Sequence, residues 1–275
     1  MTPATLQQHR ENHRLRTTAR VFSKCPDKLF GCALEIGADY GFQSRLIARY
    51  ISKLISSDIT PYIATQQGDD TITYVYCDAQ NQLEQMFAKK QFDFIFSSNV
   101  LEHLPLPDQA IKAMHQVLKD DGILIHLMPT RVFVTLQILL HVPHKIFSKM
   151  QSRSVDGEAQ KPGAFVPVWL EPTTASQSQN KLRHKIRRLL LPDPHGVSKN
   201  LLAEMRVFGK DIWKQRFEKA GFDVVKIAPG PVPAMMKGLR LGPVQSFLER
   251  CQLPTEYVYI SVKKGCHSPY LKHFV

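Results

Sequence analysis

The stretch Cys-Ala-Leu-Glu-Ile-Gly-Ala-Asp-Tyr-Gly, residues 32–41, decides the fold. Its first half, 32–36, is apolar apart from one glutamate, which is typical of a buried parallel strand. Gly37 and Gly41 then bracket a tight turn, and the pattern that follows predicts a helix over 42–52. A strand, a glycine turn and a helix in this order bring backbone amides close to a ligand at the carboxyl edge of a sheet.

Beyond this turn the sequence alternates between short β-branched or aromatic runs and amphipathic helical patterns. The further strands that this pattern predicts are 53–58, 71–77, 92–97, 123–128, 222–227 and 257–263. Such alternation is typical of an α/β protein with a doubly wound, mostly parallel, seven-stranded Rossmann-like sheet. The alternation stops after the fifth strand, so an insertion is predicted between the fifth and sixth strands.

The sequence divides into four parts on this pattern. They are a basic helical lead-in at 1–28, a Rossmann-like core at 29–130, the insertion at 131–208 and the C-terminal part of the core sheet at 209–275. The lead-in is either a solvated surface helix or a lid over the ligand edge of the sheet, and the sequence leaves both open.

Composition and charge restrict the classes of protein and partner. The 275 residues are 43% hydrophobic and 22% charged, which is typical of a globular protein. The net charge of +12 favours an anionic neighbour such as nucleic acid, an acidic membrane face or a phosphorylated substrate. The five cysteines are scattered without a Cys-x-x-Cys pair, so no metal site is predicted and a reducing, cytoplasmic setting is expected. The N-terminus lacks the apolar region of a secretory signal, and no stretch reaches the roughly 18 apolar residues that span a bilayer.

Polar side chains follow the predicted parallel strands at the point where each strand ends. Asp58 ends the second strand, Asp78 follows the third and Asn99 follows the fourth. An acid at the end of the second strand can accept hydrogen bonds from a ribose diol. An acid after the third strand can reach an adenine amino group, so both acids suit an adenosine-containing ligand. Each acid taken alone is an ordinary turn residue, because Asp favours such positions, and only the combination with the glycine turn points to a ligand site.

In these positions the chain resembles the class I S-adenosylmethionine-dependent methyltransferases, in particular the branch with a Leu-Glu-His-Leu segment after the fourth strand. The matching residues are Leu34-Glu35-Ile36-Gly37-x-x-x-Gly41, Asp58, Asp78 and the run from Phe92 to Leu104, which ends in Leu101-Glu102-His103-Leu104. The resemblance covers residues 30–130 well and touches 205–263 weakly.

The resemblance implies S-adenosylmethionine as the cofactor and a role for each matching residue. The residues expected to bind the cofactor are Glu35, Gly37, Asp39, Gly41, Asp58, Ile59, Asp78, Ala79 and Asn99. In the family the glycine turn holds the methionine portion, the acid after the second strand holds the ribose, and the residues after the third strand face adenine. Asn99 is expected to flank the sulfonium. Asp39 stands where the family usually has a glycine, so its side chain either narrows the approach to the cofactor or contacts the cofactor's amino group.

Methyl transfer from a sulfonium needs a base only if the acceptor is a hydroxyl or another group that still holds its proton. Two histidines are candidates for this base. His103 would lie close to the sulfonium, although it could equally be a turn residue that caps the next helix. His195 lies between proline and glycine in the insertion, which is where this family usually carries its substrate site.

The insertion bears on the choice of partner. Residues 132–150 begin with an apolar run, and 181–191 form a basic amphipathic pattern. Together they suit contact with an anionic membrane surface, whereas a buried helix and a solvated basic face are the alternatives. Nucleic acid is disfavoured because no aromatic residues interleave with the basic run.

The function expected from the resemblance is O-methylation of a small-molecule, lipid-linked or saccharide-linked acceptor by in-line transfer. The expected setting is cytoplasmic, with peripheral contact at the inner face of a membrane as an option. A non-catalytic binding or scaffold protein with this fold and an RNA methyltransferase remain as alternatives, and no oligomeric state is predicted.

Overall fold

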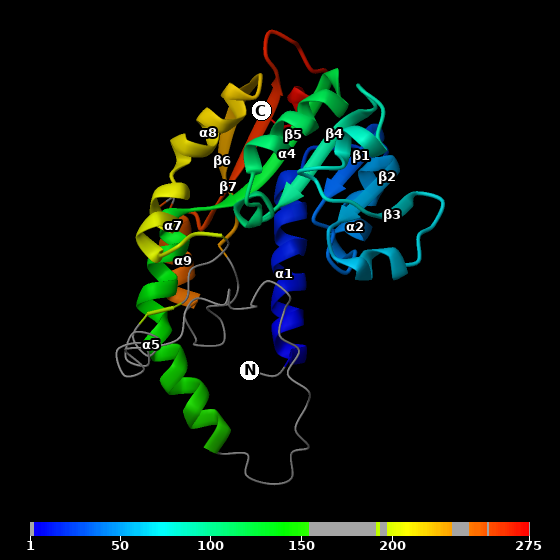
Figure 1. The fold of residues 1–275 in the computed structure, drawn as a ribbon. Coiled ribbons are helices and arrows are strands. Elements are labelled where there is room, and N and C mark those ends of the chain that lie inside the picture. The colour runs from blue at the N-terminus through cyan, green and yellow to red at the C-terminus, as the bar shows by residue number, and fades with distance from the viewer. Residues whose placement is uncertain (1–2, 154–190, 193–196, 233–241, 252, 275) are drawn as a thin grey trace, which may run out of the picture.

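The computed structural model describes residues 3–153, 191–192, 197–232, 242–251 and 253–274. Within these residues seven strands form one sheet in the order β3-β2-β1-β4-β5-β7-β6 (Figure 1). The strands are β1 (Phe30–Ile36), β2 (Ile51–Asp58), β3 (Ile72–Tyr76), β4 (Phe92–Ser98), β5 (Leu118–Pro129), β6 (Phe222–Pro229) and β7 (Glu256–Lys263). The helices are α1 (Pro3–Val21), α2 (Phe42–Ile47), α3 (Leu83–Met86), α4 (Pro107–Val117), α5 (Arg131–Arg153), α7 (Leu201–Val207), α8 (Lys210–Lys219) and α9 (Gly242–Arg250).

The direction of the strands confirms the predicted fold class. Strands β1 to β5 pair in parallel, and β7 runs antiparallel between β5 and β6. In the β5–β7 pair Pro129 lies opposite Glu256. The first residue of β7 therefore lies at the same edge at which the parallel strands end.

Helices cover both faces of the sheet. On one face, α3, α4 and α8 pack against the sheet through a cluster that includes Leu83, Ile111, Met114, Trp213 and Phe217. On the other face, an aromatic cluster joins the strands to the end of α1, to α2 and to the C-terminal residues 270–274. Its rings include Phe22, Phe30, Phe94, Phe96 and Phe274. Burial on both faces explains why these strands read as nearly continuous apolar runs.

The first half of α5 packs against two other helices. Val134 and Phe208 share one small buried cluster with α7, and Leu136 and Leu248 share another with α9. The apolar run of the insertion is therefore partly covered, as the buried-helix alternative expected. The predicted basic pattern lies almost entirely outside the described residues. In Figure 1, α1 and α5 both extend downward from the sheet.

The helix predicted over 42–52 is shorter than expected. The α-helix ends at Ile47, a 3₁₀ turn spans Ala48–Tyr50, and β2 already begins at Ile51. Ile51 pairs with Phe30 in the sheet and both side chains are fully buried. Burial within the sheet thus outweighs the weak helical preference of this segment.

Gly41 combines a left-handed backbone with a close neighbour. Its φ is +70°, and a Cβ at this position would overlap the side chain of Tyr74 on β3, with the ring carbon Cζ at 2.8 Å. Gly265, which follows β7, has nearly the same φ of +72° but no atom within 4 Å of such a Cβ.

These two glycines give a matched test of the packing under the turn. Gly265→Ala should lower the free energy of unfolding by about 1–2 kcal/mol because of backbone strain alone. Gly41→Ala should cost about 1–3 kcal/mol more, because overpacking against Tyr74 is added to the same strain. Denaturant titration of both variants measures the difference. Equal losses would mean that Tyr74 does not pack against the glycine turn.

Candidate functional site

The parallel strands bring the predicted site residues to one edge. The glycine turn leaves β1, Asp58 ends β2, Asp78 follows β3 by two residues and Asn99 follows β4 directly. Because β1 to β4 all run the same way, these residues lie at the carboxyl edge of neighbouring strands. The expected convergence of a glycine turn, two acids and an amide is thus present.

Three residues of the glycine turn have positive φ. They are Gly37 at +81°, Asp39 at +52° and Gly41 at +70°. Asp39 occupies the position where the resembled family usually has glycine, and Asp is one of the few other residues that enter the left-handed region readily. Its backbone N–H donates a 2.9 Å hydrogen bond to Asp58 Oδ2. The departure at Asp39 therefore preserves the turn and ties it to the end of β2.

The carboxylate of Asp58 is held by backbone and side-chain donors. Besides Asp39 N–H, its Oδ1 accepts hydrogen bonds of 2.8 Å from both the backbone N–H and the hydroxyl of Thr60. A carboxylate offers about four acceptor positions, so these three donors leave about one, on Oδ2. The neighbouring Ile59 is exposed over 50% of its surface and offers an apolar face. A fixed acceptor beside an exposed apolar side chain fits a ribose with its attached base.

Asp78 has a strong local role. Its carboxylate accepts a 2.9 Å hydrogen bond from Gln80 N–H and a 2.7 Å hydrogen bond from the side-chain amide of Asn81. These hydrogen bonds close the turn before α3. Asp78 therefore has the structural role of a turn residue, which was the alternative to a role in ligand binding. Ala79 is buried beside it. Contact of either residue with adenine stays a prediction.

Glu35 lies beneath the turn. It is 1% exposed, and its Oε2 accepts hydrogen bonds from Ser44 Oγ at 2.5 Å and from Ser56 Oγ at 2.9 Å. Burial raises the pKa of the Glu35 carboxyl, and the two serine hydrogen bonds oppose that change. The side chain links β1, α2 and β2, and a direct contact with cofactor stays a prediction.

A polar group that sequence reasoning missed lies next to Asn99. Asn99 has a φ of +55°, and its side-chain amide donates a 2.8 Å hydrogen bond to Glu256 Oε1. The same oxygen lies 2.8 Å from Nε2 of His13 on α1. The other Glu256 oxygen and Nδ1 of His13 are buried and have no hydrogen-bond partner within the described part of the chain. The lead-in helix therefore reaches the ligand edge, as the lid interpretation requires.

A signal for Glu256 was present in the sequence. The seventh strand was predicted to begin at Tyr257, one residue too late. An antiparallel last strand delivers its first residue to the ligand edge, so an acid there becomes a site candidate. His13 carried no comparable signal, because its contact depends on how α1 packs.

The two histidines predicted as bases are placed differently. His103 is in a 3₁₀ turn, with Nε2 3.9 Å from Oε1 of its neighbour Glu102. The pKa of Glu102 is raised to about 8, mainly by burial and to a smaller extent by the charges of Glu256 and Glu204. His195 lies outside the described residues.

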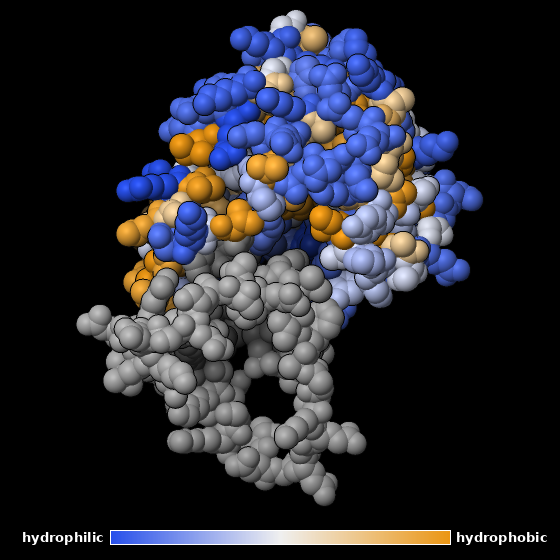
Figure 2. All heavy atoms as spheres, in the orientation of Figure 1, coloured by the Kyte–Doolittle hydropathy of each residue, from blue (hydrophilic) through white to orange (hydrophobic). Residues whose placement is uncertain are grey.

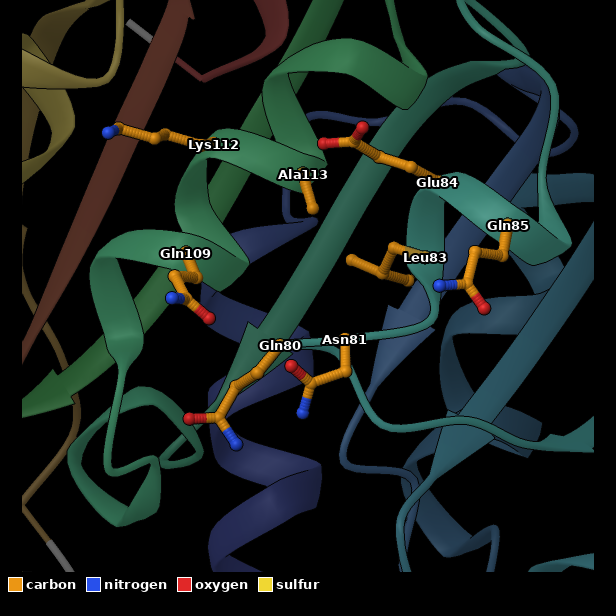
Figure 3. Close-up of a pocket in the computed structure, with 8 residues that line it drawn as sticks. All are labelled: Gln80, Asn81, Leu83, Glu84, Gln85, Gln109, Lys112 and Ala113. Atoms are coloured by element: carbon orange, nitrogen blue, oxygen red, sulfur yellow. The ribbon is translucent and has the colours of Figure 1, made fainter.

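A groove of about 360 Å³ lies between α3 and α4 (Figure 3). Its lining residues are Gln80, Asn81, Leu83, Glu84, Gln85, Gln109, Lys112 and Ala113. Gln80 and Asn81 border Asp78, but none of the predicted cofactor residues lines the groove. The groove is therefore separate from the edge described above.

Within the described residues, no group of three or more His, Cys, Asp or Glu side chains is placed to hold a metal ion. No helix within the described ranges is long and apolar enough to cross a membrane.

Residues 34–126 match the family model of the methyltransferase domain. Residues 34–126 carry a methyltransferase domain. The predicted family is thereby confirmed, together with S-adenosylmethionine as the cofactor of the class. The match contains the glycine turn, Asp58, Asp78 and Asn99.

Solved structures share the fold over nearly the whole chain. An S-adenosylmethionine-dependent methyltransferase from Mesorhizobium loti is 13% identical, with a TM-score of 0.51 over 90% of this chain and 99% of that one. A SAM-dependent methyltransferase from Archaeoglobus fulgidus is 16% identical, with a TM-score of 0.51 over 95% of this chain and 100% of that one. At these identities the likeness concerns the fold.

Similarity in sequence is local. Uncharacterized proteins from two strains of Mycobacterium tuberculosis, CDC 1551 / Oshkosh and H37Rv, are 44% identical over 50 residues. That stretch is 18% of this chain and spans only 17% of the length of these curated relatives.

Proposed function

We propose that the chain binds S-adenosylmethionine at the carboxyl edge of β1 to β4 and transfers its methyl group to a hydroxyl of a small-molecule, lipid-linked or saccharide-linked acceptor. One observation carries the first half of this proposal. The backbone N–H of Asp39, which lies in the left-handed glycine turn, donates a hydrogen bond to Asp58. This bond joins the expected methionine site to the expected ribose acceptor.

When bound, S-adenosylmethionine supplies a methyl group on a sulfonium, which already has a good leaving group. The residues of the chain therefore have mainly to orient donor and acceptor, and orientation alone can lower a barrier by about 7–11 kcal/mol. Asp58 would hold the ribose, Ile59 and Ala79 would face adenine, and Asn99 would flank the sulfonium. These assignments follow the family pattern, and Asp58 Oδ2 keeps about one acceptor position for the ribose.

The His13–Glu256–Asn99 group supports a hydroxyl acceptor. A carboxylate can only accept, so Nε2 of His13 is the donor in its hydrogen bond with Glu256. Nδ1 of neutral His13 then carries a lone pair that can take the hydroxyl proton as the oxygen forms its bond to the methyl carbon. The side-chain amide of Asn99 donates to the same oxygen of Glu256 and helps to hold it in place. A histidine oriented by a carboxylate is a common arrangement for a general base.

Donor binding can be tested with a matched pair of acids. Asp58→Asn should weaken binding of S-adenosylhomocysteine, measured by calorimetry, by roughly tenfold or more, because a hydrogen-bond acceptor for the ribose is lost. Asp69→Asn is the control. Asp69 Oδ1 also accepts two backbone N–H groups, from Thr71 at 2.8 Å and Ile72 at 2.7 Å, but at the start of β3 on the opposite edge.

Asp69→Asn should leave the affinity unchanged. If the wild-type protein binds neither S-adenosylmethionine nor S-adenosylhomocysteine, the enzyme proposal is wrong and the scaffold alternative stands. If both variants lose affinity equally, Asp58 acts only through the stability of the fold.

The acceptor class can be tested by methyl transfer. The protein is incubated with S-adenosylmethionine labelled in its methyl group and with a cell extract separated into lipids, water-soluble small molecules and RNA. Label is expected in one of the first two fractions. His13→Gln should slow this transfer by roughly 10²–10⁴-fold, as expected for loss of a general base, with little change in donor affinity.

His267→Gln is the control, because this exposed histidine lies beyond the far end of β7. His103→Gln and His195→Gln test the two bases predicted from the sequence. Label in RNA would support the RNA methyltransferase alternative and contradict this proposal. If His13→Gln transfers the methyl group at the wild-type rate, His13 is not the general base.

Contact with an anionic membrane surface through 132–150 and 181–191 also remains a proposal. The support for this contact comes from α5 and from α7 and α9, which both pack against α5. Each of the three helices carries a large exposed apolar side chain: Leu139 at 65%, Leu202 at 73% and Phe247 at 59% exposure. On the face shown in Figure 2 the hydrophobic residues lie in separate small patches between hydrophilic ones.

Flotation with vesicles that contain an anionic phospholipid tests the membrane contact. The protein should float with these vesicles at low salt and be released at high salt, since basic residues would supply the attraction. Leu139→Ser combined with Phe247→Ser should reduce flotation. Absence of wild-type flotation at low salt would contradict the proposal.

A further inference from the structure

Three side chains from distant parts of the chain form a polar cluster at the ligand edge. Glu102 lies in the turn after β4, Glu256 begins β7, and His13 extends from the middle of α1. The charge of Glu256 acts on the carboxyl of Glu102. Asn99, three residues before Glu102, donates to Glu256. The turn after β4 and the start of β7 therefore present their acids to the same place.

The position of His13 follows from the packing of α1. The next residue, Arg14, donates a hydrogen bond to the side-chain oxygen of Gln43 on α2. Two residues further on, Arg16 donates to Glu249 on α9 at 2.7 Å. The helix is thus attached to two different elements near its middle, and His13 is held beside the start of β7.

The carboxyl group of Glu102 is buried without a hydrogen-bond partner in the described part of the chain. Its side chain is fully buried, and this lack of a partner applies to both oxygens. Nε2 of His103 lies 3.9 Å from Oε1, which is too long for a hydrogen bond. Because a buried polar group without a partner is costly, a ligand atom that donates to this carboxyl would be favoured.

Two more buried atoms of the cluster lack a donor. Asn99 and His13 both use Oε1 of Glu256, whereas Oε2 has no hydrogen-bond partner among the residues that the structure describes. The same holds for Nδ1 of His13. Since Nε2 of His13 is the donor to Glu256, Nδ1 of the neutral ring is an acceptor. The cluster therefore has acceptors in excess, and a group rich in donors would complete it.

The charges of the cluster favour a cation. Glu204 on α7 is a third acid whose charge acts on Glu102. The pKa of Glu102 is raised to about 8, mainly by burial, so most of this carboxyl is protonated at neutral pH. A cation beside it would stabilise the ionised form. Within the described ranges no group of such side chains is placed to hold a metal ion, so the geometry suits an organic cation better. An ammonium brings one positive charge and three N–H donors.

We propose that Glu102 and Glu256 bind an ammonium group of the acceptor, next to the hydroxyl that reaches Nδ1 of His13. The ammonium donates to the Glu102 carboxylate and to Oε2 of Glu256. The acceptor is therefore an amino alcohol, a class that includes small amino alcohols, amino sugars and lipids with an amino-alcohol head group. This inference rests on the proposed function, because the hydroxyl at His13 is the one that receives the methyl group.

The first test removes the positive charge from the acceptor. Primary amines in the lipid and small-molecule fractions of a cell extract are acetylated with N-hydroxysuccinimide acetate, which leaves most hydroxyls free. The wild-type protein should transfer label from S-adenosylmethionine to the untreated fraction and roughly tenfold less, or none, to the acetylated one, because the charge-assisted hydrogen bonds are lost. A portion that receives only quenched reagent is the control. The fraction that loses its label shows whether the amino alcohol is a lipid or a small molecule.

The second test removes the charge from the protein. Glu102→Gln keeps the size of the side chain but cannot ionise. With limiting extract its rate should fall by roughly 10–100-fold, and more extract should restore much of the rate, because acceptor binding is weakened. Binding of S-adenosylhomocysteine should stay within about twofold of that of the wild-type protein, since Glu102 is not expected to contact the donor. Glu84→Gln is the control, because this exposed acid lies on α3 beside the separate groove, and it should change neither quantity.

The outcomes separate this inference from the proposed function. If the acetylated and untreated fractions accept label equally, or if Glu102→Gln keeps the wild-type rate with limiting extract, the inference is wrong while methylation of a hydroxyl stands. If Glu102→Gln also loses donor binding, the variant is misfolded and the acetylation test decides. If neither fraction accepts label, the proposed function is wrong and this inference fails with it.

The methylated atom is checked on the labelled product. Boiling hydriodic acid releases the label of an O-methyl ether as methyl iodide, which is the expected result. Label that stays on nitrogen under this treatment would contradict both the hydroxyl acceptor and the proposed arrangement of the amino alcohol.

Discussion

The hydrogen bond from Asp39 N–H to Asp58 Oδ2 is the contact on which the site depends. It joins the turn after β1 to the end of β2 at 2.9 Å. Asp39, which donates this bond, has a left-handed backbone, and so do Gly37 and Gly41 on either side of it. Strained backbone conformations of this kind are often kept at functional sites, where the surrounding structure holds them.

The rest of the edge is arranged around this unit. Glu35 lies below the turn and connects it to α2 and β2 through two serines. Asn99, a second non-glycine residue with positive φ, continues the edge at β4 and reaches Glu256 on β7. Residues with positive φ therefore follow both β1 and β4 at this edge. The antiparallel β7 adds an acid that a purely parallel sheet would not place there.

The sequence predicted the fold and the placement of the candidate donor residues because both follow from local sequence patterns. Buried parallel strands read as apolar runs, and the residue that ends each run marks the ligand edge. Asp58 and Asn99 were found in this way. Asp39 was flagged as a departure from the family, and the structure explains it through the tolerance of Asp for the left-handed region.

The contacts of α1 with the ligand edge could not be predicted in the same way, because they join distant parts of the chain. His13 and Glu256 are 243 residues apart, and Arg14 and Gln43 are 29 apart across a helix packing that no local pattern specifies. The short helix α2 was overestimated for a related reason, since pairing of Ile51 with Phe30 ends it early. Tertiary packing decided each of these cases, whereas local propensity decided the strands.

A crystal structure of the protein with S-adenosylhomocysteine tests the central claim most directly. The account predicts a ribose hydroxyl at Asp58 Oδ2, the adenine between Ile59 and Ala79, and the sulfur facing Asn99, with the backbone of the glycine turn unchanged. Ligand bound instead in the groove between α3 and α4, or bound at the edge only after the bond between Asp39 and Asp58 has broken, would contradict it.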